Sequence, residues 1–179
     1  MTSPRADRVV ATLFFIVTFF SVGEAAFESH VNYPAWLYLT DQSFRPYHQA
    51  ISARIGVLIV PLVLSTILNV LLFWWRPRSI PLWTVWSTLG LQIGVWISAI
   101  LVQIPIQVQL SAGGYSAELL QRLISTDLLY RKGPGYLRLA ITGLMLYGVI
   151  KAAPVPMESE PPNNEMQRTK PAQATELRR

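Results

Sequence analysis

Residues 83–110, WTVWSTLGLQIGVWISAILVQIPIQVQL, decide the fold class of this chain. The stretch holds no charged side chain, and it exceeds the roughly 20 residues that a helix needs to cross the ~30 Å hydrocarbon core of a bilayer. Three more stretches are dominated by apolar residues, at 9–27, 51–75 and 136–153. Backbone facing lipid must satisfy its hydrogen bonds internally, so each is expected to be a helix. The sequence predicts an all-α polytopic membrane protein, a bundle of four transmembrane helices.

Basic residues in short connections predict the orientation of these helices, because Lys and Arg favour the cytoplasmic side. The residues in question are Arg5, Arg8, Arg76, Arg78 and Lys151. They place both termini in the cytoplasm, in a bacterial inner membrane. The connection with Arg122, Arg131 and Lys132 would then face outside. Small residues at 23–26 also resemble a signal-peptide cleavage region, and cleavage there would leave three helices with the same sidedness.

Two segments lie outside the four apolar stretches. Residues 116–131 place leucine and isoleucine at helical spacing, with polar residues opposite, which predicts a short amphipathic helix on the outer surface, packed over the mouth of the bundle. From Pro154 the chain is rich in Pro, Glu, Asn and Gln, a composition that cannot bury enough apolar surface to fold. We therefore expect a transmembrane domain over 1–153 and a disordered cytoplasmic tail over 154–179.

Composition excludes several classes of function. The net charge is +5, but Lys and Arg are scattered rather than gathered in a stripe with aromatic residues, so nucleic acid is not expected as a partner. The absence of cysteine excludes disulfides, thiolate metal sites and thiol nucleophiles. No Gly-rich phosphate loop, zinc-protease motif or nucleophile elbow occurs. Any chemistry must rest on carboxylates, histidines, arginines and amides.

Polar residues recur at helical spacing on one face of each predicted helix. The first helix has Ser21, Glu24 and Glu28 on this face, and the second has Arg54, Pro61, Ser65 and Asn69. The third has Thr88, Gln92, Trp96, Ala99, Gln103 and Gln107, and the fourth has Arg138 and Thr142. They are expected to point into the bundle, because an ionisable group in hydrocarbon costs at least about 2.5 kcal/mol. Most of the uncharged ones are interpreted as contacts between helices, each worth about 0.6 kcal/mol. Pro105 is expected to kink the third helix between two of its glutamines.

The charged residues and both histidines gather at the predicted outer end. The candidate catalytic residues are Glu28, His30 and His48, and the candidate ligand-binding residues are Glu24, Arg54, Gln103, Gln107, Asp127 and Arg138. One interpretation is structural, with Glu24 or Glu28 paired to Arg54 or Arg138. The other is a polar chamber, closed by residues 33–48 and the amphipathic helix, that binds a small ligand, a proton or a metal.

A metal at this end would need about three ligands from Glu24, Glu28, His30 and His48. Oxygen and imidazole donors of this kind suit zinc, iron or copper. The spacing of the two histidines matches no established ligand pattern, so the sequence identifies neither a metal nor another cofactor.

Several segments resemble small four-helix bacterial membrane proteins that are distantly similar to the anthrone-oxygenase-like membrane family. They are FESHVNYPAW at 27–36, Tyr47-His48, QIPIQ at 103–107 and TDLLYR at 126–131. The resemblance covers about residues 9–151. It implies a four-helix architecture and oxygenase-like chemistry on a lipophilic substrate without a classical cofactor, and it points to Glu28 and the two histidines.

Three functions are consistent with these observations. The first is a membrane protein that binds or oxidises a small lipophilic molecule in the outer chamber. The second is a non-catalytic accessory subunit whose polar stripes contact other membrane helices. The third is a small transporter, which would need to oligomerise because four helices enclose no path.

Overall fold

The computed structural model describes residues 4–153, so the expectation for the tail at 154–179 lies outside it. These residues form helices and no strand, which confirms the all-α class. Four helical rods follow one another along the chain. The first rod contains α1 (Pro4–Phe27), the π-helix η1 (Glu28–Asn32) and α2 (Tyr33–Trp36), and the second contains α3 (Asp41–Ser52) and α4 (Gly56–Leu71). The third contains α5 (Leu82–Ser98), the π-helix η2 (Ala99–Gln103) and α6 (Ile104–Gly113), and the fourth contains α7 (Ala117–Asp127), the π-helix η3 (Leu128–Lys132) and α8 (Gly133–Lys151).

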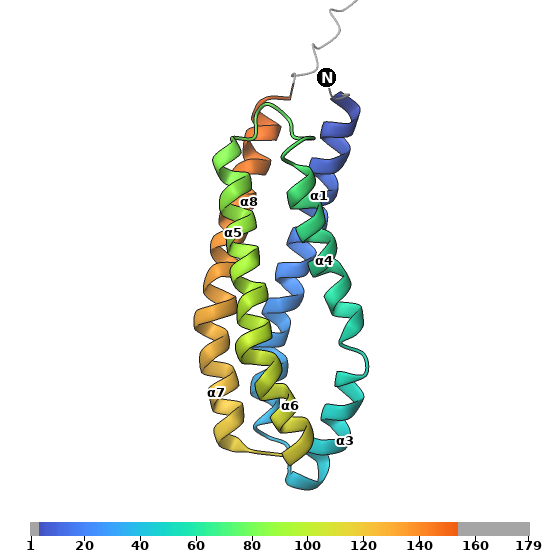
Figure 1. Ribbon diagram of the computed structural model, residues 1–179, viewed down its shortest axis with the longest axis vertical. Helices are drawn as coiled ribbons and strands as arrows, with labels where there is room; N and C mark the ends of the chain where they lie inside the picture. The colour runs from blue at the N-terminus through green and yellow to red at the C-terminus, as the bar shows by residue number, and fades with distance from the viewer. Residues whose placement is uncertain (1–3, 154–179) are drawn as a thin grey trace, which may run out of the picture.

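The four rods run side by side as an elongated bundle (Figure 1). In one half of the bundle α1 packs against α4 and α8, and α5 packs against the same two helices. The start of α1, the connection at 72–81 and the end of α8 lie together at what we term the terminal end. The short connections at 37–40 and 114–116 lie at the opposite, loop end. The first and last described residues are therefore on the same side of the bundle.

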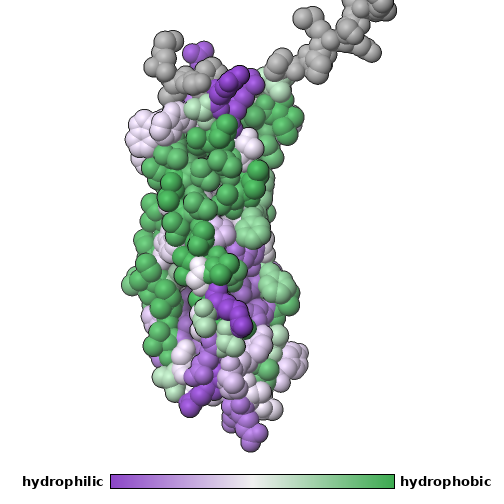
Figure 2. All heavy atoms as spheres, turned by 90° about the vertical axis from the view of Figure 1, so that its right-hand side faces the viewer, coloured by the Kyte–Doolittle hydropathy of each residue, from purple (hydrophilic) through white to green (hydrophobic). Residues whose placement is uncertain are grey.

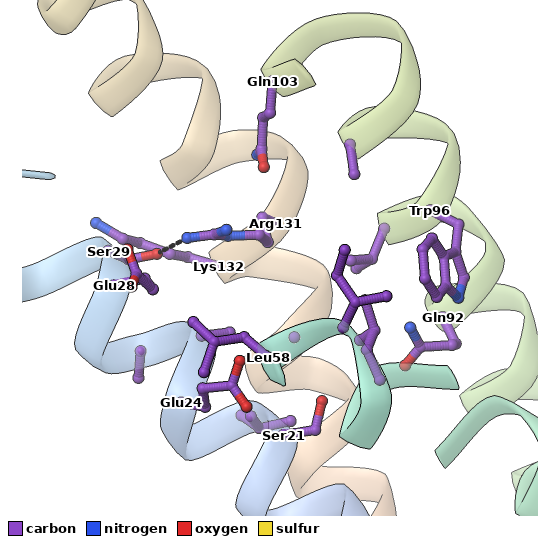
Figure 3. A pocket seen from close by; sticks show the side chains of 18 of the residues that line it. Ser21, Glu24, Glu28, Ser29, Leu58, Gln92, Trp96, Gln103, Arg131 and Lys132 are labelled. Atoms are coloured by element: carbon purple, nitrogen blue, oxygen red, sulfur yellow. Dashed lines mark hydrogen bonds between the residues drawn. The ribbon is translucent and has the colours of Figure 1, made fainter. Parts of the chain in front are cut away.

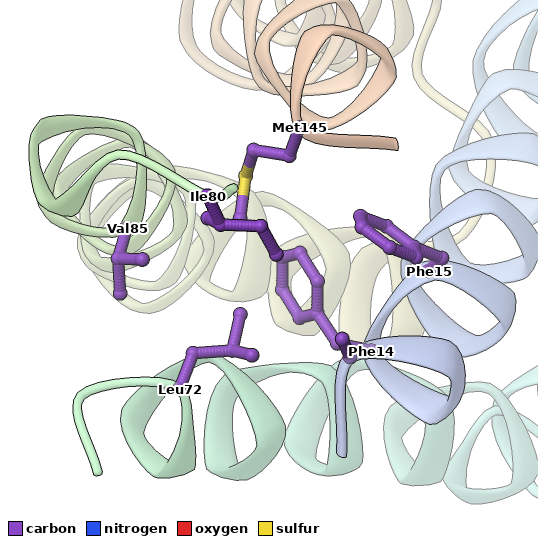
Figure 4. Close-up of a cluster of buried hydrophobic side chains, with 7 residues drawn as sticks. Phe14, Phe15, Leu72, Ile80, Val85 and Met145 are labelled. Carbon is purple, nitrogen blue, oxygen red and sulfur yellow. The ribbon is translucent and has the colours of Figure 1, made fainter. Parts of the chain in front are cut away.

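The half near the terminal end has its own apolar core (Figure 4). Its buried members are Ala11, Phe14, Phe15, Leu72, Ile80, Val85 and Met145. They come from α1, α5, α8 and the connection after α4, so this cluster joins all four rods. The connection also lies close to α8, since a Cβ added to Gly148 would lie 3.0 Å from the carbonyl oxygen of Ser79.

The half near the loop end has a second core. Its buried members are Tyr33, Trp36, Phe44, Ile106, Leu110, Leu120 and Leu123. Leu120 and Leu123 are 0% exposed and belong to α7. The prediction of an amphipathic helix at this position is confirmed, but its placement is wrong. Rather than lying across the bundle mouth, α7 forms the lower half of the fourth rod and supplies its apolar face to this core (Figure 1).

The first and fourth rods are longer than predicted, because π-helical turns carry them past Pro34 and Pro134. Each π-helix ends two residues before a proline, namely Pro34, Pro105 and Pro134. Proline lacks an N–H, and its ring clashes with the carbonyl four residues earlier, so an ordinary α-helical turn is strained there. A wider turn relieves that strain without ending the helix. The kink expected at Pro105 thus takes the form of η2.

The second rod is interrupted at the same level, between α3 and α4, which meet at an angle of 43°. Residues 53–55 form the turn between them. Each of the four rods is therefore divided once into a part near the terminal end and a part near the loop end. The dividing segments, in chain order, are η1, the turn at 53–55, η2 and η3.

On the face seen in Figure 2, exposed apolar side chains cover the half near the terminal end, while polar side chains gather among apolar ones in the other half. By length and composition, Arg5–Trp36 and Leu82–Gly113 are suited to cross a membrane, and α3 with α4 adds a third span if the bent pair counts as one. The predicted fourth crossing at 136–153 does not meet the same test. Its helix begins with Gly133-Pro134-Gly135 and carries Arg138, which lower its hydropathy.

Candidate functional site

A cavity of about 320 Å³ lies between the four rods at the level of the π-helices (Figure 3). We call it the chamber. Its polar lining residues are Ser21, Glu24, Glu28, Ser29, Tyr33, Gln92, Trp96, Gln103, Gln107, Arg131, Lys132, Tyr136 and Arg138. Apolar side chains from α1, α4, α5 and η2 form the rest of the wall. Although many lining residues carry a polar group, most of the surface that faces the cavity is apolar, as is common for small-molecule sites.

The predicted stripe of the third rod faces the interior of the bundle, although Thr88, which is buried, lies outside the chamber lining. Gln92, Trp96, Ala99, Gln103 and Gln107 all line the chamber. The stripe runs through η2, whose wider turn keeps Ala99 and Gln103 facing the same interior.

The stripe of the first rod is also confirmed. Ser21, Glu24 and Glu28 line the chamber from the end of α1 and the start of η1. Glu28 Oε2 accepts a hydrogen bond from Asn32 Nδ2 at 2.7 Å, one turn further along the rod.

The chamber wall near η3 is built around Asp127, which is 0% exposed. Its Oδ1 lies 2.6 Å from Arg131 Nε and its Oδ2 lies 3.8 Å from Lys132 Nζ. Arg131 Nη2 donates to Ser29 Oγ at 2.9 Å, a contact drawn in Figure 3. The guanidinium also lies 5.2 Å from the ring centre of Tyr33. Arg131 therefore joins the fourth rod to the first across the chamber.

The ion pairs expected from the sequence do not form within residues 4–153. Glu24 and Glu28 pair with neither Arg54 nor Arg138, and the carboxylate in an ion pair is Asp127. Arg54 is exposed and donates to the carbonyl of Ala50 at 3.1 Å, because the break between α3 and α4 turns it away from the interior. Its assignment to the chamber was wrong.

Arg138 lies deeper in the bundle and is 2% exposed. Its Nη2 donates to both Thr18 Oγ1 and Ser65 Oγ, and those two hydroxyls lie 2.9 Å apart. The predicted inward position of Arg138 is thus confirmed, but its contacts are hydroxyls on two other rods. It closes the end of the chamber nearer the terminal end.

Both histidines lie on helices rather than in a loop. His30 is exposed on η1, with its Nε2 2.6 Å from Tyr136 Oη. His48 is 1% exposed on α3, donates from Nε2 to Gln107 Oε1 at 2.7 Å, and stacks on Phe44. Neither histidine lines the chamber, although each is hydrogen-bonded to a residue that does.

No metal centre emerges from these placements. Among residues 4–153, no three His, Asp or Glu side chains lie close enough together to hold a metal ion. The four candidate ligands are divided between the chamber, where Glu24 and Glu28 lie, and two separate hydrogen bonds made by His30 and His48.

Charges in and next to the chamber balance. Glu24, Glu28 and Asp127 supply three carboxylates, and Arg131, Lys132 and Arg138 supply three cations. The formal sum is zero, so the chamber suits an uncharged occupant better than an ion.

Within the described chain, three polar atoms of the wall have neither a hydrogen-bond partner nor an ion-pair partner. They are Glu24 Oε2, Gln92 Nε2 and Arg138 Nε. Gln92 is 1% exposed, and a buried amide without a partner costs about 1–3 kcal/mol. The wall therefore offers an acceptor on α1 and a donor on α5 to any molecule between them.

Arg131, Lys132, Ser29 and Tyr33 line the chamber but were not among the candidate residues expected from the sequence. Arg131 and Lys132 were predicted to lie in an outer connection, because the fourth apolar stretch begins only at residue 136. The three prolines that follow the π-helices are the signal that could have located the chamber.

Comparisons with known protein families, with curated proteins and with solved structures find no match for this chain. The resemblance to the anthrone-oxygenase-like family therefore stays a prediction.

Proposed function

We propose that this protein is an integral membrane protein that binds an uncharged, lipophilic small molecule in the chamber. The observation that carries the proposal is the wall itself, whose surface is mainly apolar and includes an unpartnered acceptor, Glu24 Oε2, and an unpartnered donor, Gln92 Nε2. A molecule with an apolar body and a hydroxyl would complement these atoms, since the hydroxyl can donate to Glu24 or accept from Gln92. Its binding would recover the cost of leaving a buried amide unpaired.

The wall also favours entry from the side. Ile55, Ile59 and Ile104 line the chamber, yet they are 38%, 45% and 53% exposed on the surface of the bundle. They lie where the second rod is broken and where η2 ends. A lipophilic molecule dissolved in a bilayer would reach the chamber past these side chains without crossing water.

The proposed membrane position follows from the surface. The apolar half would lie in the bilayer with all four rods crossing, including α8, and the half with α3, α6 and α7 would project on the outer side. Basic residues at the terminal end, including Arg5, Arg8 and Lys151, favour the cytoplasm there. This orientation places both ends of the bundle domain inside the cell and the chamber near the outer interface of a bacterial inner membrane.

Binding is favoured over the role of an accessory subunit. Ser65, Asn69, Thr88 and Thr142 are each 0% exposed, so the polar stripes are used within the bundle and are not free to contact other helices. Oxidation is not part of the proposal, because neither His30 nor His48 lines the chamber.

The test uses 2-naphthol as an uncharged lipophilic probe and 2-naphthoate as its charged counterpart. Binding to the purified protein in micelles is measured by isothermal titration. We expect 2-naphthol to bind and 2-naphthoate to bind at least tenfold more weakly. Gln92→Leu should weaken 2-naphthol binding about tenfold, the loss of one buried hydrogen bond.

Two further variants provide the controls. Thr88→Val makes a similar polar-to-apolar change one turn away on α5, outside the chamber lining, and should leave binding unchanged. Ala25→Phe places a ring in the chamber and should abolish binding. If the protein bound no 2-naphthol, or if Ala25→Phe bound it as well as the wild type, the proposed function would be wrong.

A further inference from the structure

A second cavity, of about 710 Å³, lies at the terminal end of the bundle, far from the chamber. We call it the basic groove. Its apolar floor is formed by side chains of α1 and α8, including Phe15, Ile16, Phe19 and Leu146. Arg8, from the start of α1, and Arg78, from the connection at 72–81, line it as well.

The two arginines have no partner within residues 4–153. Arg8 and Arg78 are exposed, and neither forms an ion pair or a side-chain hydrogen bond with another described residue. No carboxylate lines the groove. It therefore presents two uncompensated positive charges next to an apolar track, and Ile16 in that track is 60% exposed.

We propose that the basic groove binds an anionic phospholipid. Such a lipid complements the groove, because its phosphate can lie against the two guanidinium groups while its acyl chain lies on the apolar track. Basic pockets between transmembrane helices on the cytoplasmic side bind the headgroups of such lipids, and each Lys or Arg near the surface contributes about a fivefold gain in affinity. The groove lies at the end that its basic residues place in the cytoplasm, where Arg8 and Arg78 would meet the anionic leaflet.

The chain contains one competing occupant. Ala153 lines the groove, and the sequence beyond it carries Glu158 and Glu160. An acidic segment could neutralise the arginines, but it could not fill the apolar track as an acyl chain does. The lipid satisfies both parts of the groove, and the experiment below distinguishes the two.

The experiment is a lipid titration of the full chain by native mass spectrometry, with phosphatidylglycerol as the anionic lipid and phosphatidylcholine as the neutral one. We expect phosphatidylglycerol to bind more tightly. Arg8→Gln and Arg78→Gln should each weaken it about fivefold, and the double variant about 25-fold, without changing phosphatidylcholine binding. Arg54→Gln, a change at another exposed arginine, should have no effect.

Two variants keep the result interpretable. Arg8→Lys with Arg78→Lys retains both charges and should retain most of the lipid preference, which separates lost charge from lost folding. Glu158→Gln with Glu160→Gln should leave phosphatidylglycerol affinity unchanged. The proposal is overturned if the double Gln variant binds phosphatidylglycerol like the wild type. It is also overturned if removing the two glutamates raises that affinity severalfold, because the acidic segment would then be the occupant.

Discussion

Asp127→Asn tests whether the ion pair in the chamber wall stabilises the fold. Asp127 is 0% exposed and has Arg131 Nε at 2.6 Å and Lys132 Nζ at 3.8 Å. Asparagine keeps the shape of the side chain but removes its charge, so two cations lose their counter-charge. Removing one partner of a buried pair costs about 3–5 kcal/mol. Because 17% of the Arg131 side chain is exposed to solvent, we expect the low end, about 3 kcal/mol of unfolding free energy.

The assay is denaturant unfolding in mixed micelles followed by far-ultraviolet circular dichroism. Arg131→Gln and the double variant complete a cycle, whose coupling energy should be at least about 1 kcal/mol because the two side chains are in contact. Glu118→Gln, an exposed carboxylate on the same helix, should change stability by less than about 0.5 kcal/mol. A loss below 1 kcal/mol for Asp127→Asn, or one equal to that of Glu118→Gln, would refute the reasoning.

Three other changes test separate parts of the bundle. Gly148→Ala places a methyl group 3.0 Å from the Ser79 carbonyl oxygen and should lower the melting temperature. Gly143→Ala, on the same helix but with open space around it, should raise the free energy of unfolding by about 0.5–1 kcal/mol. Equal effects of the two changes would contradict the close approach of Gly148 to Ser79. Arg138→Met removes a buried charge that has no ion pair in the described chain, so unfolding should show no loss of stability; a loss above 1 kcal/mol would contradict this. His48→Leu breaks the hydrogen bond to Gln107 and should lower the free energy of unfolding by about 1–2 kcal/mol, while 2-naphthol binding is unchanged. Loss of 2-naphthol binding in this variant would show that His48 contributes to the binding site.

Helical periodicity predicted the interior of the bundle well. The stripe from Gln92 to Gln107 and the pair Glu24 and Glu28 were placed on inward faces, and all line the chamber. These assignments succeed because the cost of a polar side chain in lipid depends only on which face it occupies. The same rule placed Arg138 inside the bundle.

The errors arise where local sequence does not show whether a helix continues or breaks. The apolar stretch at 136–153 and the amphipathic segment at 116–131 were predicted as separate helices, which put Arg131 in an outer connection. The structure keeps the rod continuous through η3. Arg54 was misplaced for the opposite reason, because no proline or glycine at 52–55 marks the break that turns it outward.

The two separate apolar cores have a mechanical consequence. Each holds together the rods in its own half of the molecule, and the halves are joined by η1, η2, η3 and the turn at 53–55. Such segments are weaker in bending and torsion than continuous α-helix, because their hydrogen bonds are less well aligned or missing. A twisting load on the projecting half should therefore deform this one layer more than the rest of the bundle. The contacts of any molecule held between the four rods there would change first.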